Sequence, residues 1–107
     1  MKIIVTGDGI SVTDALKQHI EIKLQRIKHH FEHIDTVHVT LRVEKLVHTA
    51  EAGVSIAKNI IHARAEDADM YTAIDDMADM IDKQLLKHKE KIKHHWDEYV
   101  GKKNHHH

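Results

Sequence analysis

Lysine side chains crowd the second half of the last predicted helix. Between residues 83 and 93 the sequence has one acid, Glu90, and the five lysines Lys83, Lys87, Lys89, Lys91 and Lys93. At about 100° per residue, Lys83, Lys87 and Lys91 share one side of a helix, and the other two lie on another side. Ammonium groups spaced about 6 Å apart suit a polyanionic backbone. These five lysines are therefore candidates for contact with RNA or another polyanion.

A solvated helix face is the simpler interpretation of the same lysines. Acids early and bases late in a helix complement its dipole, and exposed lysines are common. However, the dipole effect fades within the last turn, whereas this run spans about three turns. Its neighbours four residues apart are like charges, which repel each other. From the residues alone, a polyanionic partner and a solvated face both stay open.

A second basic set lies on the first predicted helix. Lys23 and Arg26 flank one side of its apolar stripe, and Lys17 and Lys28 flank the other. Acidic residues dilute this set, so a solvated helix is the simpler interpretation. If the two helices lie side by side, their basic flanks could form one groove. Lys23, Arg26 and Lys28 are therefore further candidates for RNA contacts.

The polar side of the predicted strands carries Arg42, His62 and Arg64. Phe, Tyr and Trp are absent from these strands, which argues against stacking of single-stranded bases on the sheet. Recognition of folded RNA through its shape and phosphates fits better.

The search for catalytic and metal-binding residues gives no convincing set. His29 and His33 are four residues apart, but no cysteine exists and no carboxylate completes a set at metal-ligand spacing. The acids of residues 75–82 are better explained by the helix dipole. No glycine-rich phosphate loop is present. We expect no enzyme activity, no metal and no cofactor.

Length and composition indicate one small domain. The chain has 107 residues, a formal net charge of −1 and no cysteine, which fits a reducing cytosol. No apolar run approaches the roughly 20 residues of a membrane span, and no signal peptide is evident. We expect a soluble, cytoplasmic protein with a single domain at residues 1–97. Residues 98–107 are expected to be a loose tail that ends in a remnant of a histidine tag, His105–His107.

Hydrophobic periodicity predicts an α+β fold. Expected strands cover residues 2–6, 36–45, 51–57 and 60–66, and expected helices cover residues 12–31 and about 70–96. Ser11 is the expected cap of the first helix and Asp69 that of the second. Lys58 and Asn59 are expected to form a tight turn, because Asn tolerates positive φ. The order β-α-β-β-β-α predicts a four-stranded sheet with both helices on one face.

Several segments closely resemble the ribosome hibernation promoting factor family, which includes the ribosome-associated inhibitor protein Y. The most specific are Asp69-Met70-Tyr71-Thr72-Ala73-Ile74-Asp75 and the lysine helix from Lys83 to Lys89; Arg42–Thr49 and Ile61–Glu66 also match. The resemblance covers about residues 1–97. It implies a fold topologically similar to a double-stranded RNA-binding domain, with basic residues of both helices facing ribosomal RNA.

The resemblance also implies a function. Family members bind the decoding region of the small ribosomal subunit, contact 16S rRNA within the 70S ribosome and block messenger RNA and transfer RNA. Translation is inhibited during starvation or stationary phase. The chain has no second domain after the helix and no long acidic tail, so it resembles the short type. That type acts with the ribosome modulation factor to form inactive 100S ribosome dimers. The alternative is a protein-interaction module that binds no RNA.

Overall fold

The structure is a computed structural model that describes residues 1–31 and 33–100, with side chains described for residues 1–29, 31 and 33–88. Six elements follow each other in the predicted order. They are β1 (Lys2–Asp8), α1 (Asp14–His30), β2 (Ile34–Glu44), β3 (Val47–Ile56), β4 (Asn59–Asp67) and α2 (Met70–Val100). The predicted β-α-β-β-β-α order is therefore confirmed.

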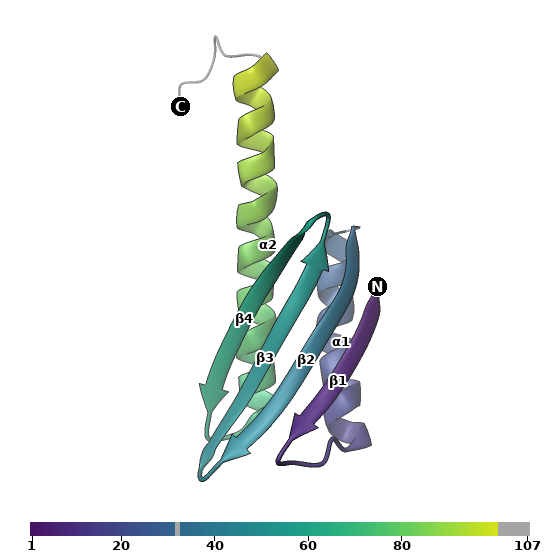
Figure 1. Ribbon diagram of the computed structural model, residues 1–107, viewed down its shortest axis with the longest axis vertical. Coiled ribbons are helices and arrows are strands. Elements are labelled where there is room, and N and C mark those ends of the chain that lie inside the picture. The colour runs from purple at the N-terminus through teal and green to yellow at the C-terminus, as the bar shows by residue number, and fades with distance from the viewer. Residues whose placement is uncertain (32, 101–107) are drawn as a thin grey trace.

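The four strands form one mixed sheet with the spatial order β1-β2-β3-β4. β1 runs parallel to β2, and the other two pairs are antiparallel. Both helices cover the same face of this sheet, and the other face is open (Figure 1). A parallel first pair requires a crossover connection, which α1 provides.

The core lies between the sheet and the two helices and is almost entirely aliphatic. Alternate residues of β2 point into it, because successive side chains of a strand face opposite sides. α1 and α2 contribute residues three or four positions apart, as the periodicity predicted. The largest fully buried side chains are Ile20, Leu24, Val37, Val39, Leu41, Val54, Ile74, Met77, Ile81 and Leu85.

Helix α1 is capped by Thr13, so the prediction of Ser11 was wrong. The Thr13 hydroxyl Oγ1 accepts a hydrogen bond from the backbone N–H of Leu16 at 3.2 Å, and α1 begins at Asp14. A cap must directly precede the first helical residue for its side chain to reach these N–H groups. At α2 the predicted cap is confirmed, since the Asp69 carboxylate accepts from the N–H of Thr72 at 3.0 Å.

Two tight turns join the three antiparallel strands. Lys45 and Ala57 have φ values of 58° and 56°, in the left-handed region. The expected positive φ at Asn59 was wrong, because Asn59 pairs with Ile56 as the first residue of β4. Residues 46–49, which the sequence leaves between two expected strands, are also mostly strand, since β3 begins at Val47. The strands pair over more residues than expected, so both turns lie one to several residues earlier or are shorter than the sequence predicted.

Helix α2 has 31 residues and continues well past the end of the sheet (Figure 1). Leu85 is its last described buried side chain. Near this point Gln84 donates a side-chain hydrogen bond to the backbone carbonyl of His62 on the edge strand β4. The helix reaches Val100, beyond the predicted end near Trp96; residues 101–107 lie outside the described part. The domain boundary at residue 97 stays a prediction.

No helix within the described residues is both long and apolar enough to cross a membrane.

Candidate nucleic-acid interface

The two helices that carry the candidate basic residues pack against each other. His19 and Lys23 of α1 both approach one carboxylate of α2. Oδ1 of Asp75 lies 2.7 Å from Nε2 of His19 and 3.4 Å from Nζ of Lys23. The Lys23 ammonium group is therefore partly neutralised within the protein.

The acidity of Asp75 reflects these contacts. Partial burial alone would raise the pKa of its carboxyl group. Hydrogen bonds with His19 and Lys23, together with their positive charges, outweigh burial and lower the pKa below its ordinary value. Asp75 is thus held in its charged form between the helices.

A groove of about 230 Å³ runs between α1 and α2. Lys23, Arg26 and Ile27 line it from α1, and Ala78, Asp79 and Asp82 line it from α2. The basic flank of α1 therefore faces the acidic flank of α2. Along the described side chains this groove has mixed charge, so it is not the continuous basic groove that we considered from the sequence.

Lys83 and Lys87 lie on another side of α2. Both are exposed, and at about 100° per residue each is displaced by roughly 100° or more around the helix from Asp82. The buried Ile81 and Leu85 are each about 200° around the helix from Lys83, so Lys83 faces away from the sheet. Among the described side chains, neither ammonium group has a carboxylate oxygen within 4 Å. Their positive charge is available to a partner.

The structure describes the side chains of only some of the remaining basic candidates. Lys89, Lys91 and Lys93 belong to α2, but their side chains lie outside the described part. On α1, Arg26 and Lys28 are exposed, whereas Lys23 is half-buried and paired. Among the described side chains, the candidate lysines Lys28, Lys83 and Lys87 therefore have no ion-pair partner, and Arg26 lies beside the mixed groove.

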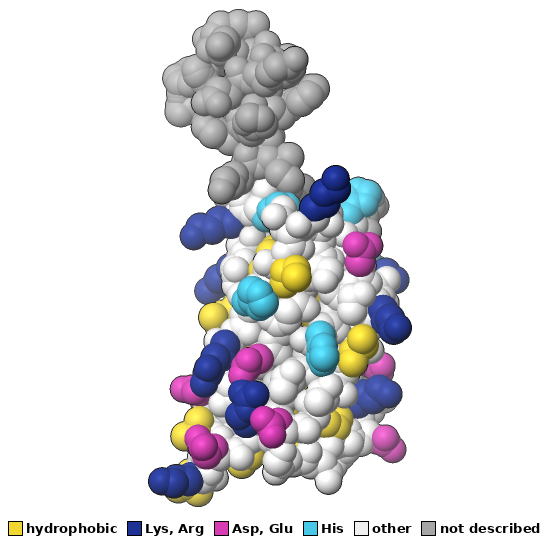
Figure 2. Space-filling model, in the orientation of Figure 1, with side chains coloured by type: hydrophobic (Ala, Val, Ile, Leu, Met, Phe, Trp, Pro, Cys, Tyr) yellow, Lys and Arg dark blue, Asp and Glu magenta, His cyan; other side chains and the backbone are white. Residues whose placement is uncertain are grey.

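The open face of the sheet has a different electrostatic character. Arg42 pairs with Asp8 at 2.9 Å and with Glu51, and these hydrogen bonds raise the pKa of its guanidinium group above an already high value. Arg64 pairs with Glu66 at 3.0 Å. Figure 2 shows basic and acidic side chains interspersed on this face. Phosphate neutralisation is therefore better served by the helices than by the sheet.

Histidines and acids do not gather into a metal site in the described part of the chain, where no three His, Cys, Asp or Glu side chains come together. His29 and His33 are both exposed. Sequence reasoning missed the contact between His19 and Asp75, because it depends on how the two helices are rotated against each other. The only signal was the spacing of His19 and Lys23 along one side of α1.

Solved structures share this fold. The ribosomal subunit interface protein from Coxiella burnetii has a TM-score of 0.81 and 33% identity, covering 84% of this chain and 99% of that chain. The N-terminal domain of Thermus thermophilus protein Y has a TM-score of 0.72 and 29% identity, covering 78% and 94%.

Curated relatives match at the level of sequence. The ribosome hibernation promoting factor of Escherichia coli strain K12 is 40% identical over 95 residues, which are 89% of this chain and 100% of the relative. That of Azotobacter vinelandii is 44% identical over 91 residues, 85% of each chain. These relatives are named for ribosome hibernation and not for a catalysed reaction, in agreement with the prediction of a non-enzymatic protein.

A family model described as Sigma 54 modulation protein / S30EA ribosomal protein matches residues 3–93, which include the whole sheet from Ile3 onward, α1 and most of α2. With the fold, the topology and the relatives all in agreement, the chain belongs to this family of ribosome hibernation factors.

Proposed function

We propose that this protein binds ribosomal RNA of the small subunit through its helical side and so keeps the ribosome inactive. The unpaired ammonium groups of Lys83 and Lys87 carry the proposal, since they are exposed and without a carboxylate partner among the described side chains. The family membership supports the ribosome as the partner.

The proposed mechanism is steric exclusion combined with phosphate neutralisation. A domain placed in the decoding region would occupy the paths of messenger RNA and transfer RNA. The protein would then promote inactive ribosome dimers together with the ribosome modulation factor. The sheet and core supply a rigid body, and the lysines of α2 supply the attraction to the RNA backbone.

Charge reversal at the two described lysines tests this proposal. We expect Lys83→Glu combined with Lys87→Glu to weaken binding to purified small subunits by about 100-fold, because each phosphate contact of an ammonium group is a charge-assisted interaction. The fold should persist, since both side chains are exposed. Co-sedimentation at several salt concentrations gives the affinity, and circular dichroism checks the fold.

Lys45→Glu combined with Lys58→Glu is the matched control. Both residues are exposed in the turns that join the strands rather than on α2, and the double change alters the net charge equally. If this control weakens binding as much as the change at Lys83 and Lys87, the attraction is general and the α2 site is wrong. A ribosome complex that forms without RNA contacts and is insensitive to salt would instead favour the protein-interaction alternative.

A further inference from the structure

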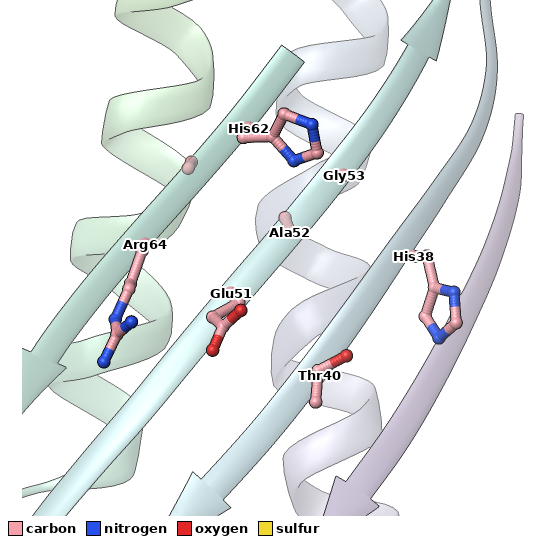
Figure 3. A pocket seen from close by; sticks show the side chains of 8 residues that line it. His38, Thr40, Glu51, Ala52, Gly53, His62 and Arg64 are labelled. Carbon is pink, nitrogen blue, oxygen red and sulfur yellow. The ribbon is translucent and has the colours of Figure 1, made fainter. Parts of the chain in front are cut away.

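A hollow of about 440 Å³ lies on the open face of the sheet, on the side opposite the helices (Figure 3). It takes residues from β2, β3 and β4. They are His38, Thr40, Glu51, Ala52, Gly53, His62, Ala63 and Arg64. Its size falls in the range of small-ligand sites, roughly 300–1,000 Å³. The helical interface uses none of these residues.

Strand register explains why the sheet is hollow here. Gly53 of β3 pairs with His38 of β2 on one side and with His62 of β4 on the other. The middle position of this row therefore has no side chain. A Cβ atom built at Gly53 would meet no atom closer than 3.9 Å, the nearest being Nδ1 of His62 and Cγ2 of Ile60. The floor of the hollow is thus bare backbone with room above it.

The next row along the same face supplies polar groups. Thr40, Glu51 and Arg64 are paired across the three strands, two residues along from the histidine row. Successive side chains alternate between faces, so both rows project to the open side (Figure 3). The hollow therefore has the His62 imidazole at one end and a hydroxyl, a carboxylate and a guanidinium group at the other, while the His38 ring at its border is turned toward β1.

These groups suit a flat, neutral ring with polar edges. The His62 imidazole is exposed and lies beside Gly53, so one of its faces can stack on a planar ligand. The His38 ring is held by a 3.0 Å contact between its Nε2 and Oγ1 of Thr6. The Thr40 hydroxyl and the guanidinium N–H groups of Arg64 that do not bind Glu66 can meet the edge of such a ring, whereas the Glu51 carboxylate is already held by Arg42. Because Arg42 and Arg64 are already paired with acids, the face gives little attraction to phosphate alone.

We propose that this hollow binds one unpaired purine base of single-stranded RNA, stacked on His62 above Gly53. Imidazole rings serve as stacking surfaces for unpaired bases, as the larger aromatic side chains do. A purine offers more stacking surface than a pyrimidine and carries both donors and acceptors on its edge. The absence of Phe, Tyr and Trp from the strands had argued against base stacking; the histidines supply the flat surface that this argument overlooked.

This site does not depend on the lysines of α2, which lie on the helical side. The test is therefore made on the protein that carries Lys83→Glu and Lys87→Glu, so that the two proposals fail or succeed separately. The probe is a uridine hexamer with one central 2-aminopurine, whose fluorescence falls when the base stacks. We expect a saturable loss of fluorescence as protein is added. A hexamer with one central adenine should compete at least about tenfold better than an all-uridine hexamer.

Three substitutions on the strands separate stacking from other contacts. His62→Ala should weaken binding of the probe about tenfold or more, whereas His62→Phe, which keeps a flat ring, should retain it. Gly53→Val should abolish binding by filling the floor, and valine is favoured in strands. Ser55→Val is the control, since Ser55 lies on the same face of β3 but outside the hollow.

Thermal unfolding shows that each variant is folded, and His62→Phe keeps the test valid if Gly53→Val proves unstable. The proposal is overturned if His62→Ala binds the probe as the parent does, or if His62→Phe binds as weakly as His62→Ala. Equal competition by the adenine-containing and all-uridine hexamers would also overturn it, because it would indicate contacts to phosphate and sugar only.

Discussion

His19 on α1 and Asp75 on α2 are joined side chain to side chain, with 2.7 Å between the imidazole Nε2 and the carboxylate Oδ1. The ring of Tyr71, one turn earlier on α2, stands edge-on to the same imidazole with 5.1 Å between the ring centroids. Both side chains of this polar contact are partly exposed to solvent. It links the two helices that carry the candidate RNA-binding residues.

Removal of the Asp75 charge should weaken this link. We expect Asp75→Asn to lower the free energy of unfolding at pH 7 by up to about 1 kcal/mol, since the pair is partly exposed to solvent. Asp76→Asn, a change at an exposed neighbour without a described ion pair, should have a smaller effect. Urea denaturation followed by circular dichroism gives both values. Equal losses in the two variants would show that the contact with His19 and Lys23 does not stabilise the fold.

The same pair predicts a pH dependence. The pKa of Asp75 in the folded protein is lowered from its ordinary value of 3.8, so its stabilising contribution is fully present above that value. It is lost as the pH falls through the lowered pKa, because the protonated carboxyl group no longer attracts His19 and Lys23. The difference in unfolding free energy between the parent and Asp75→Asn should therefore shrink between about pH 4 and lower pH. A difference that stays constant over this range would contradict the assignment.

The cap of α1 gives a local prediction. Thr13→Ala should cost about 1 kcal/mol of stability, because the N–H of Leu16 loses its acceptor. Ser11→Ala, a similar loss of a hydroxyl two residues earlier, should change stability by less than about 0.5 kcal/mol. Chemical denaturation of the two variants side by side measures the contrast. A larger cost for Ser11→Ala would restore Ser11 as the cap.

Adjacent leucines on α2 test how the helix is docked. Leu85 is fully buried and Leu86 is 47% exposed. We expect Leu85→Ala to destabilise the protein by about 2–5 kcal/mol through loss of apolar contacts and a residual cavity. Leu86→Ala should cost far less, about 0.5 kcal/mol. Similar unfolding midpoints for the two variants would mean that α2 does not rest on the sheet in this orientation.

Two lysines of α1 should contribute unequally to the proposed ribosome binding. Lys28→Gln should lower the slope of log affinity against log salt by about 1, as expected for the loss of one phosphate contact. Lys23→Gln should change the slope clearly less, because Asp75 already neutralises much of the Lys23 charge at 3.4 Å. The measurement is co-sedimentation with small subunits across a salt series. A larger change of slope for Lys23→Gln than for Lys28→Gln would instead place the RNA over the groove between the helices.

Much of the fold could be predicted because the hydrophobic pattern is regular. Val37, Val39 and Leu41 alternate with polar residues, and all three are buried on β2 as expected. The cap of α1 was harder, because Ser11 and Thr13 both have hydroxyl groups. The loop before the helix decides between them. It folds tightly over Gly7, where a Cβ atom would lie 2.3 Å from the carbonyl oxygen of Ile10.

The candidate site was only partly predictable, because it depends on contacts between elements that lie far apart in the sequence. Spacing along one helix indicates that Lys83 and Lys87 share a side. It does not indicate which helix or strand faces that side, so the pairing of Lys23 with Asp75 could not be predicted. The hollow at Gly53 also depends on contacts between strands. Without the register that aligns His38, Gly53 and His62, these residues are three unrelated positions in the sequence.

The hydrogen bond from Gln84 to the carbonyl of His62 has a consequence for self-association. Unpaired backbone groups on an edge strand can pair with the edge of another molecule, which leads to aggregation. Gln84 occupies one such acceptor on β4. Helix α2 thereby covers one acceptor of an edge at which two molecules could otherwise join into one continuous sheet.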